Sequence, residues 1–287
     1  MNFGDGSPLC PIPSATVLML RDAPHGLEVF LLKRHGLSDV LGGAYVFPGG
    51  KMDRQDMGFV GRLDQPTRVL HETLGEPQLS EAQAAALYVA AIREVFEEAG
   101  VLFAALEAVL TPESWASLHA GRPFGEVLDL VDAPLAVAGL VPWSRWITPV
   151  ASVRARKHFD ARFFVAAVPP GQEPVHDQHE ATESVWLAPQ RALREYWEGR
   201  IQLAAPQIMS LALLSRYRDV AGVLAEARGR KPPCIHPEVF DQGGIHIVCY
   251  PGDEGHSMRS RVIPGPTRLS WRNDRYEPEG GLDALFG

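Results

Sequence analysis

Short apolar segments separated by turn residues open the chain. Residues 14–20 (SATVLML) and 27–33 (LEVFLLK) are apolar, and Pro24 and Gly26 lie between them. Proline and glycine supply turn chemistry, so this pattern predicts a hairpin of core strands. A loop with paired glycines, GGAYVFPGG at 42–50, follows. Its glycines permit close approach of the backbone to a ligand or to another strand.

A strong helical signal lies between positions 80 and 100. Ser80 with Gln83 fits a capping box, and Gly100 stands where a left-handed residue ends a helix. Apolar residues recur between them at spacings of three and four, which predicts one buried face. We therefore expect a helix over about 81–99. The mixed polar segment before it, 51–79, is expected to hold at most short helices.

Downstream, helices and strands are expected to alternate. The segment 101–142 has a helical, loop-rich pattern, 161–168 and 183–188 resemble buried strands, 190–199 a short helix, 205–228 a long amphipathic helical region, and 244–250 a strand. The last 35 or so residues are rich in Arg, Gly and Pro and are predicted to be irregular. We interpret 10–200 as one domain and 201–287 as an extension, helical and then irregular, packed on it.

Composition narrows the function classes. The 287 residues are 46% apolar, enough for a large core, and the formal net charge of −8 argues against nucleic acid as a partner. Any anionic substrate must be held locally, by a few cations or by a metal. Three cysteines match no disulfide framework, and neither a signal peptide nor a run of 18 apolar residues is present. We expect a cytoplasmic protein with no membrane partner.

The predicted helix carries an unusually acidic face. Glu94, Glu97 and Glu98 stand at i, i+3 and i+4, which places three carboxylates side by side. Each like-charge pair costs roughly 0.2–0.5 kcal/mol, so the arrangement calls for a cation. Carboxylate oxygens suit Mg²⁺ or Mn²⁺. A solvated acidic surface is the plainer alternative, but Arg93 can pair with Glu97 at i+4 and hold it in place.

The segment REVFEEAGV at 93–101 and the glycines before it resemble the signature of the Nudix hydrolase family. That signature is Gly, five residues, Glu, seven residues, then Arg-Glu, an aliphatic, any residue, Glu-Glu, any residue, Gly and an aliphatic. Counted from Gly50, Asp56 stands where the family prefers Glu. The arginine would then fall at position 64 but stands at 93, so the box contains 29 additional residues.

Such an insertion, together with RWITPVASVRARKHFDARFFVA, WLAPQRAL and YPGDE, resembles the branch of nucleoside diphosphate-linked moiety X motif 19, a coenzyme A diphosphatase. The resemblance implies an α/β/α sandwich with a mixed sheet. It also implies that Glu94, Glu97 and Glu98 bind Mg²⁺ or Mn²⁺ and that metal-bound water attacks phosphorus. Family members differ on the base. It is Glu94 or a carboxylate outside the box, for which Glu180 and Glu183 are our candidates.

Coenzyme A hydrolysing members carry a further motif before the box. Aligned on Phe47, Pro48, Gly49 and Gly50, this chain has Arg34 and Gly43 at the expected positions. It has Asp39 in place of the second arginine and His35 in place of a small residue. The cluster of Arg154, Arg156, Lys157 and His158 offers compensating charge, with Arg156 our candidate phosphate contact. A solvated basic loop is the alternative interpretation.

Several alternatives remain open at this stage. Other small-molecule diphosphates, such as ADP-ribose, a dinucleotide or a nucleotide sugar, compete with coenzyme A. A non-catalytic binding module would keep the fold. A homodimer could form through the insertion or the C-terminal region. Trp143 or Trp146 could stack on an adenine. His176, His179 and Glu180 do not have zinc-site spacing.

Overall fold

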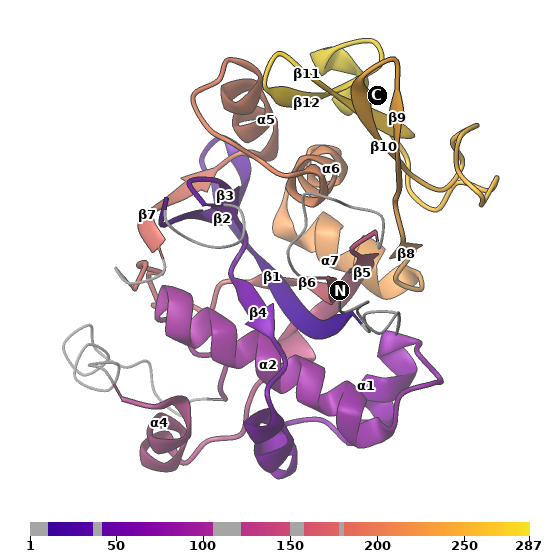
Figure 1. Cartoon of the computed structure of the whole chain (residues 1–287). Coiled ribbons are helices and arrows are strands. Elements are labelled where there is room, and N and C mark those ends of the chain that lie inside the picture. The colour runs from indigo at the N-terminus through magenta and orange to yellow at the C-terminus, as the bar shows by residue number, and fades with distance from the viewer. Residues whose placement is uncertain (1–10, 37–41, 106–121, 150–157, 178–180) are drawn as a thin grey trace, which may run out of the picture.

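The computed structural model describes residues 11–36, 42–105, 122–149, 158–177 and 181–287 (Figure 1). Its main element is an eight-stranded mixed sheet with β1 near its centre. The strands are β1 (Ile12–Ala23), β2 (Gly26–Arg34), β3 (Tyr45–Val46), β4 (Gly49–Lys51), β5 (Val141–Ile147), β6 (Phe159–Ala167), β7 (Ala181–Leu187) and β8 (Cys234–Ile235). The path runs β3-β2-β1-β6-β5-β8, while β4 pairs with β1 and β7 with β2. The β1–β6 and β5–β8 pairs are parallel.

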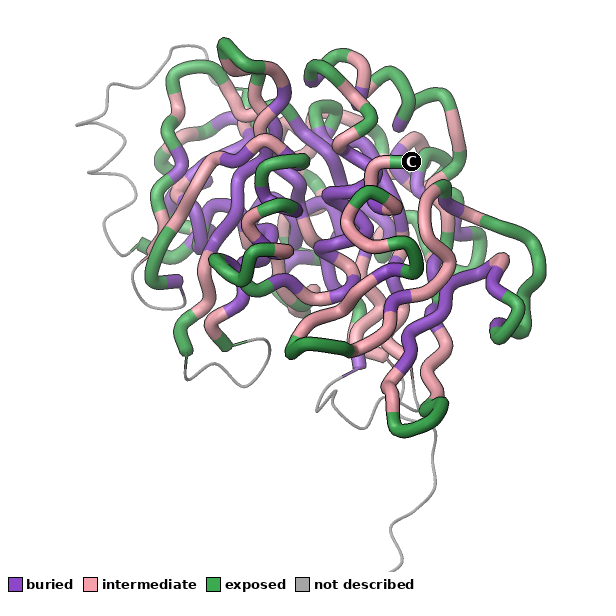
Figure 2. The backbone as a smooth tube through the Cα atoms, turned by 90° about the horizontal axis from the view of Figure 1, so that it is seen from above, coloured by how far each residue is buried: buried purple, intermediate pink, exposed green. Residues whose placement is uncertain are grey.

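Helices cover both faces of this sheet, as the resemblance implied. Side chains alternate along a strand, so Val17 and Met19 of β1 enter one core and Leu18 and Leu20 the other. The first core lies under α2 (Glu81–Ala99), with η1 (Arg54–Arg62), α1 (Thr67–Leu74), α4 (Phe124–Val131) and η2 (Val137–Gly139) around it. The second lies under α5 (Pro189–Trp197), α6 (Ala205–Leu214) and α7 (Val220–Gly229). Figure 2 shows buried backbone through the middle of the molecule.

Helix α2 confirms the prediction for 81–99. The Ser80 hydroxyl accepts from the Gln83 backbone N–H, and the Gln83 side-chain oxygen accepts from the Ser80 backbone N–H. Gly100 ends the helix with a left-handed φ of 66°. The helix is more enclosed than its pattern predicted, because Ala84 through Ile92 are all buried. The reason is the insertion, whose α1 and η1 pack on the side of α2 that faces away from the sheet.

The C-terminal region differs from the prediction. The helical segment expected over 205–228 is two helices, because the chain turns after α6 and Asp219 caps α7 by accepting from the Gly222 N–H at 2.8 Å. Strands β9 (Glu238–Gln242), β10 (Ile245–Cys249), β11 (Arg268–Arg272) and β12 (Arg275–Pro278) form a four-stranded antiparallel sheet, followed by η3 (Leu282–Leu285). The strand predicted at 244–250 is confirmed as β10. The irregular tail predicted for the last 35 or so residues is wrong where it contains β11, β12 and η3.

This second sheet packs over α5 and α6 (Figure 1). Leu269 of β11 and Leu285 of η3 are part of the core that lies under α5, α6 and α7. Tight turns explain how such short strands pair. Asn273 and Asp274 both have positive φ, as do Gly243 and Gly244, and two-residue loops of this kind match the twist of a hairpin. Within the described part of the chain, every helix is too short or too polar to cross a bilayer.

Candidate active site

Arg93, near the C-terminal end of α2, is the centre of the acidic site. Its Nε and Nη2 donate to Asp56 at 2.7 and 3.1 Å, and Nη2 also donates to the Lys51 carbonyl at 2.9 Å. Nη1 donates to Glu94 at 2.8 Å and to Glu97 at 2.9 Å, so the predicted i+4 pair is confirmed. Burial alone would lower the pKa of Arg93, but the bond to Asp56 and the nearby glutamates raise it. The side chain is a permanent cation.

Asp56 was the position whose role the sequence left open. It is fully buried, and its Oδ2 also accepts from the Asp53 backbone N–H at 2.7 Å. The shorter aspartate therefore reaches Arg93 from the turn that begins η1. The 29 additional residues come after Asp56 in the chain, where they include the rest of η1 and α1, so Asp56 and Arg93 still meet. The sequence signal for this contact was an acidic residue six positions after Gly50, where the family signature has Glu.

The paired glycines let the chain pass directly beneath the glutamates. A Cβ on Gly50 would stand 2.5 Å from the Glu94 carboxylate, and one on Gly49 would stand 2.4 Å from the Ala15 carbonyl oxygen. The Gly49 N–H donates to Glu98 Oε2 at 2.9 Å. Glycine is required at both positions, because the backbone of β4 lies against the Glu94 carboxylate and donates a hydrogen bond to Glu98.

The three glutamates differ in exposure. The side chain of Glu97 is 44% exposed and that of Glu94 is 14% exposed, while Glu98 is buried. Among the described residues, no three acidic, His or Cys groups are already gathered as a metal site. The donor chemistry nevertheless fits a hard divalent cation. One helical turn presents three carboxylates, the ligands that such a cation prefers. Arg93 contacts Glu94 and Glu97, and its opposite side is paired with Asp56.

Of the two carboxylates proposed from outside the box, the structure describes Glu183, and it does not bring Glu183 to this site. Glu183 lies opposite Lys33 in the β2–β7 pair, on the face that packs against α5 and α6 rather than α2. It contacts Lys33 at 3.4 Å. Burial and a hydrogen bond with Glu183 raise the pKa of Tyr45 on that same face. A slip of one residue in the strand would have reversed this orientation, which sequence alone does not fix. Glu180 lies outside the described residues.

The residues proposed for substrate binding form the loop that leads to β4. The Gly43 N–H donates to the Arg34 carbonyl, and the Arg34 N–H donates to the Ala44 carbonyl. Arg34 therefore lies beside Gly43. The Pro48 carbonyl accepts from the Val17 N–H at 2.9 Å. Phe47 is buried against Phe163, with ring centroids 6.3 Å apart, and so shapes the loop from within.

The structure tests the predicted role of the two tryptophans but not that of the basic cluster. Arg154, Arg156, Lys157 and Asp39 lie outside the described residues, and His158 is buried at the start of β6. Stacking of Trp143 or Trp146 on an adenine is contradicted, because only 1% and 4% of these residues is exposed. Both pack in the core beneath α6 and α7.

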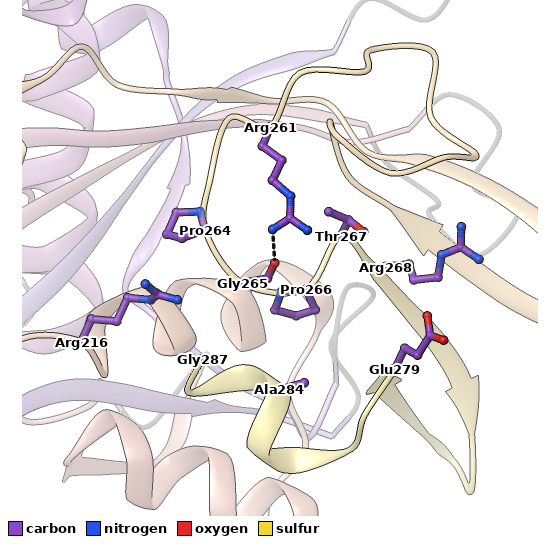
Figure 3. A pocket seen from close by; sticks show the side chains of 10 residues that line it. All are labelled: Arg216, Arg261, Pro264, Gly265, Pro266, Thr267, Arg268, Glu279, Ala284 and Gly287. Carbon is purple, nitrogen blue, oxygen red and sulfur yellow. Dashed lines mark hydrogen bonds between the residues drawn. The ribbon is translucent and has the colours of Figure 1, made fainter.

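An open hollow of about 610 Å³ lies away from α2, at the C-terminal end of the described chain. It is lined by Arg216, Arg261, Pro264, Gly265, Pro266, Thr267, Arg268, Glu279, Ala284 and Gly287 (Figure 3). Arg261 donates to the Gly265 carbonyl, and Arg268 is paired with Asp253. None of the predicted site residues that the structure describes lines this hollow.

Comparison with known proteins agrees with this geometry. A family model described as the NUDT19 Nudix domain matches residues 62–214. Acyl-coenzyme A diphosphatase NUDT19 of Xenopus laevis is 26% identical over 239 residues, which cover 67% of this chain and 61% of the frog protein. The human protein of the same name is 26% identical over 277 residues, covering 80% of this chain and 72% of its own length.

A solved structure shares the fold. The NUDIX hydrolase from Alicyclobacillus acidocaldarius superposes with a TM-score of 0.60 at 24% identity, covering 79% of this chain and 99% of the other. This similarity supports the mixed sheet and its helices. Because the family model covers more than half of the residues, the chain belongs to the Nudix hydrolase family, in the branch of the NUDT19 Nudix domain.

Proposed function

We propose that this chain hydrolyses a phosphoanhydride bond in a nucleoside diphosphate-linked substrate, with coenzyme A or an acyl-coenzyme A as the favoured substrate. Mg²⁺ or Mn²⁺ would be held by Glu94, Glu97 and Glu98. The observation that carries the proposal is the support of Glu94, which lies against the bare backbone of Gly50 while Arg93 donates to it. A solvated acidic surface would need neither contact.

Each residue of the site has a separate task. Asp56 fixes the guanidinium of Arg93, and Arg93 in turn orients Glu94 and Glu97. Gly49 orients Glu98 through its N–H. When bound, the divalent ion would lower the pKa of water and neutralise charge on the phosphoryl oxygens. Glu94 is our first candidate for the general base, because Glu183 points to the opposite face of the sheet. Glu180 stays the second candidate.

The choice of coenzyme A rests on two supports. The frog and human relatives are named acyl-coenzyme A diphosphatases. Arg34 and Gly43, which stand at two positions of the coenzyme A motif, also lie together before β4, where the Gly43 N–H donates to the Arg34 carbonyl. A chain with a net charge of −8 needs local cations for such an anion, and Arg34 and Arg156 are the ones we propose.

A substrate panel tests the reaction. Purified protein is incubated with coenzyme A, an acyl-coenzyme A, ADP-ribose, a dinucleotide and a nucleotide sugar, each with Mg²⁺ or Mn²⁺, and products are identified by mass. We expect coenzyme A to give phosphopantetheine and an adenosine bisphosphate. Preference for another diphosphate would change the substrate but keep the chemistry. Failure to turn over any of them would favour a binding module.

The metal face is tested with Glu97→Gln. The change removes one charge from an exposed carboxylate, so turnover should fall almost completely while the free energy of unfolding changes little. Glu72→Gln is the matched control, because Glu72 pairs with Arg68 on the surface of α1, away from the glutamates. Normal turnover in Glu97→Gln would show that the assigned face is wrong.

A cytoplasmic location and a homodimer stay predictions. The location rests on the three cysteines, whose spacing matches no disulfide framework. Light scattering at several protein concentrations would measure the mass in solution and decide between monomer and dimer.

A further inference from the structure

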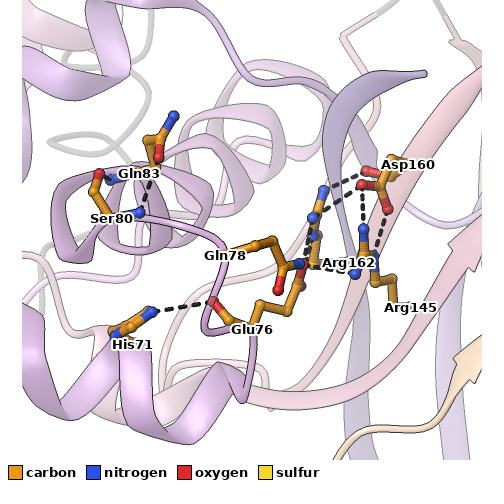
Figure 4. Close-up of polar contacts among 8 residues, drawn as sticks. All are labelled: His71, Glu76, Gln78, Ser80, Gln83, Arg145, Asp160 and Arg162. Atoms are coloured by element: carbon orange, nitrogen blue, oxygen red, sulfur yellow. Dashed lines mark hydrogen bonds and ion pairs between the residues drawn. The ribbon is translucent and has the colours of Figure 1, made fainter. Parts of the chain in front are cut away.

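A second group of charges, buried or partly buried, consists of Glu76, Arg145, Asp160 and Arg162 (Figure 4). Arg162 alternates with Phe163 and so lies on the face of the sheet that α2 covers. Arg162 of β6 donates to Glu76 through Nε at 2.8 Å and Nη2 at 2.6 Å. Arg145 of β5 donates to Asp160 through Nε and Nη2, both at 2.7 Å. Arg145 also reaches Glu76 at 2.9 Å, and Arg162 reaches Asp160 at 3.0 Å. Each guanidinium therefore contacts both carboxylates, and the four charges balance.

Glu76 is the member of this network that comes from the insertion. It lies four residues before Ser80, the residue that caps α2, and only 7% of it is exposed. Gln78 donates to its carboxylate at 3.0 Å, and His71 contacts its backbone carbonyl at 3.0 Å. Glu76 thus joins the turn that begins α2 to two strands of the sheet.

The strand register connects this network to the metal face. Arg145 is the partner of Arg162, Arg162 is the partner of Ala15, and Ala15 is the partner of Gly50. These four residues form one row across β5, β6, β1 and β4. Gly50 is the residue that supports Glu94. Two strand spacings, about 10 Å, separate Gly50 from Arg162 along this row.

A buried ion pair therefore anchors each end of the insertion. Asp56 pairs with Arg93 near the C-terminal end of α2, and Glu76 pairs with Arg162 just before its N-terminal end. Both contacts are buried. Together they fix where α2 lies on the sheet, and hence how far its glutamates stand from β4.

We propose that Glu76 is a positioning residue for the metal site: through Arg162 and Arg145 it sets the position of α2 against the row of residues that ends at Gly50. This inference rests on the proposed function. Removing the Glu76 charge leaves two guanidinium groups with one carboxylate, Asp160. Removing one partner of a buried ion pair is strongly destabilising, because the remaining charge is uncompensated. The result is a shift of α2 that loosens the glutamates.

The test measures binding of Mn²⁺ alone to the full chain, by electron paramagnetic resonance of the free ion, together with the melting temperature. In Glu76→Gln we expect Mn²⁺ affinity to fall about 2- to 30-fold, the range for residues that act through a network. Asp253→Asn is the matched control. Asp253 is also buried and accepts from Arg268 with both oxygens, but it lies in the segment that joins β10 to β11 of the C-terminal sheet.

The control separates positioning from stability. Asp253→Asn should lower the melting temperature and leave Mn²⁺ affinity unchanged. Equal Mn²⁺ affinity in wild type and Glu76→Gln would overturn the inference and leave the proposed function intact. If wild type does not bind Mn²⁺, both fall.

A milder variant decides the matter if Glu76→Gln does not fold. Arg145→Lys keeps the charge but loses the two-pronged contact with Asp160. Weaker Mn²⁺ binding in Arg145→Lys would then support the inference, and wild-type affinity would overturn it.

Discussion

The carboxylate of Asp56 meets the guanidinium of Arg93 edge to edge, with Oδ1 2.7 Å from Nε and Oδ2 3.1 Å from Nη2. Asp56 is fully buried and 3% of Arg93 is exposed. The remaining nitrogen of Arg93, Nη1, faces Glu94 and Glu97. One side of the arginine is thus fixed by the fold, and the other side orients the acidic face.

Asp56→Asn should be strongly destabilising. The change keeps the shape of the side chain but leaves the buried Arg93 charge without its main partner, at a cost of about 3–5 kcal/mol. Urea unfolding of both proteins measures the difference. Asp129→Asn is the control, because Asp129 is 79% exposed in its pair with Arg62 and such surface pairs contribute little. A loss no larger than that of the control would contradict the structural role of Asp56.

Alanine at Gly50 and at Gly49 should have different effects. At Gly50 the new methyl group would meet the flexible end of Glu94, so the carboxylate moves and turnover falls while the fold survives. At Gly49 it would meet the Ala15 backbone, so the protein itself loses stability. Thermal melting and turnover, measured for both variants, separate the two effects. Equal melting temperatures would show that the β1–β4 contact is looser than described.

Tyr196→Phe should detach the C-terminal sheet. The Tyr196 hydroxyl donates to the Tyr276 carbonyl at 3.0 Å and accepts from the Tyr276 N–H at 2.7 Å. Phenylalanine leaves both backbone groups without this partner, at a cost of about 1–3 kcal/mol. Urea unfolding and proteolysis within 238–287 report the change. Tyr88→Phe, which loses only a 3.4 Å bond to Leu70, should cost less, and an equal cost would count against the prediction.

The contribution of Asp253 to stability should depend on pH. Burial alone would raise the pKa of Asp253, but bonds from Arg268, Gly255 and Thr267 lower it overall. A lowered folded pKa stabilises the protein above the unfolded value of about 3.9, and this stabilisation is lost as the pH falls through the folded value. The difference in unfolding free energy between wild type and Asp253→Asn should therefore shrink in acid. Urea titrations between about pH 2.5 and 7 check this, and a constant difference would refute it.

Local signals predicted much of the fold. The capping box at Ser80 and the terminator at Gly100 gave α2 its observed limits, because both act within one turn of helix. The turn at Pro24 and Gly26 likewise predicted the β1–β2 hairpin. The i+4 pair of Arg93 with Glu97 also followed from helical geometry alone. These features need no knowledge of the rest of the chain.

Other features depend on register and on distant contacts. The partner of Arg93 is 37 residues away, and the orientation of Glu183 depends on which residue of β2 it pairs with. In the C-terminal sheet, β10 was predicted from its apolar residues, but β9, β11 and β12 were missed because they have only four or five residues, many of them polar. The two-residue turns Gly243-Gly244 and Asn273-Asp274 were the signal that could have revealed them.

The two buried carboxylates at the ends of the insertion join it to α2 and to the sheet, so that these parts form one body. Between Asp56 and Glu76, η1 and α1 pack on α2, while Gly58 and Gly61 of η1 have open space around them. A short peptide tag or a fluorophore attached at Gly58 or Gly61 would therefore be carried rigidly and would report the tumbling of the whole protein.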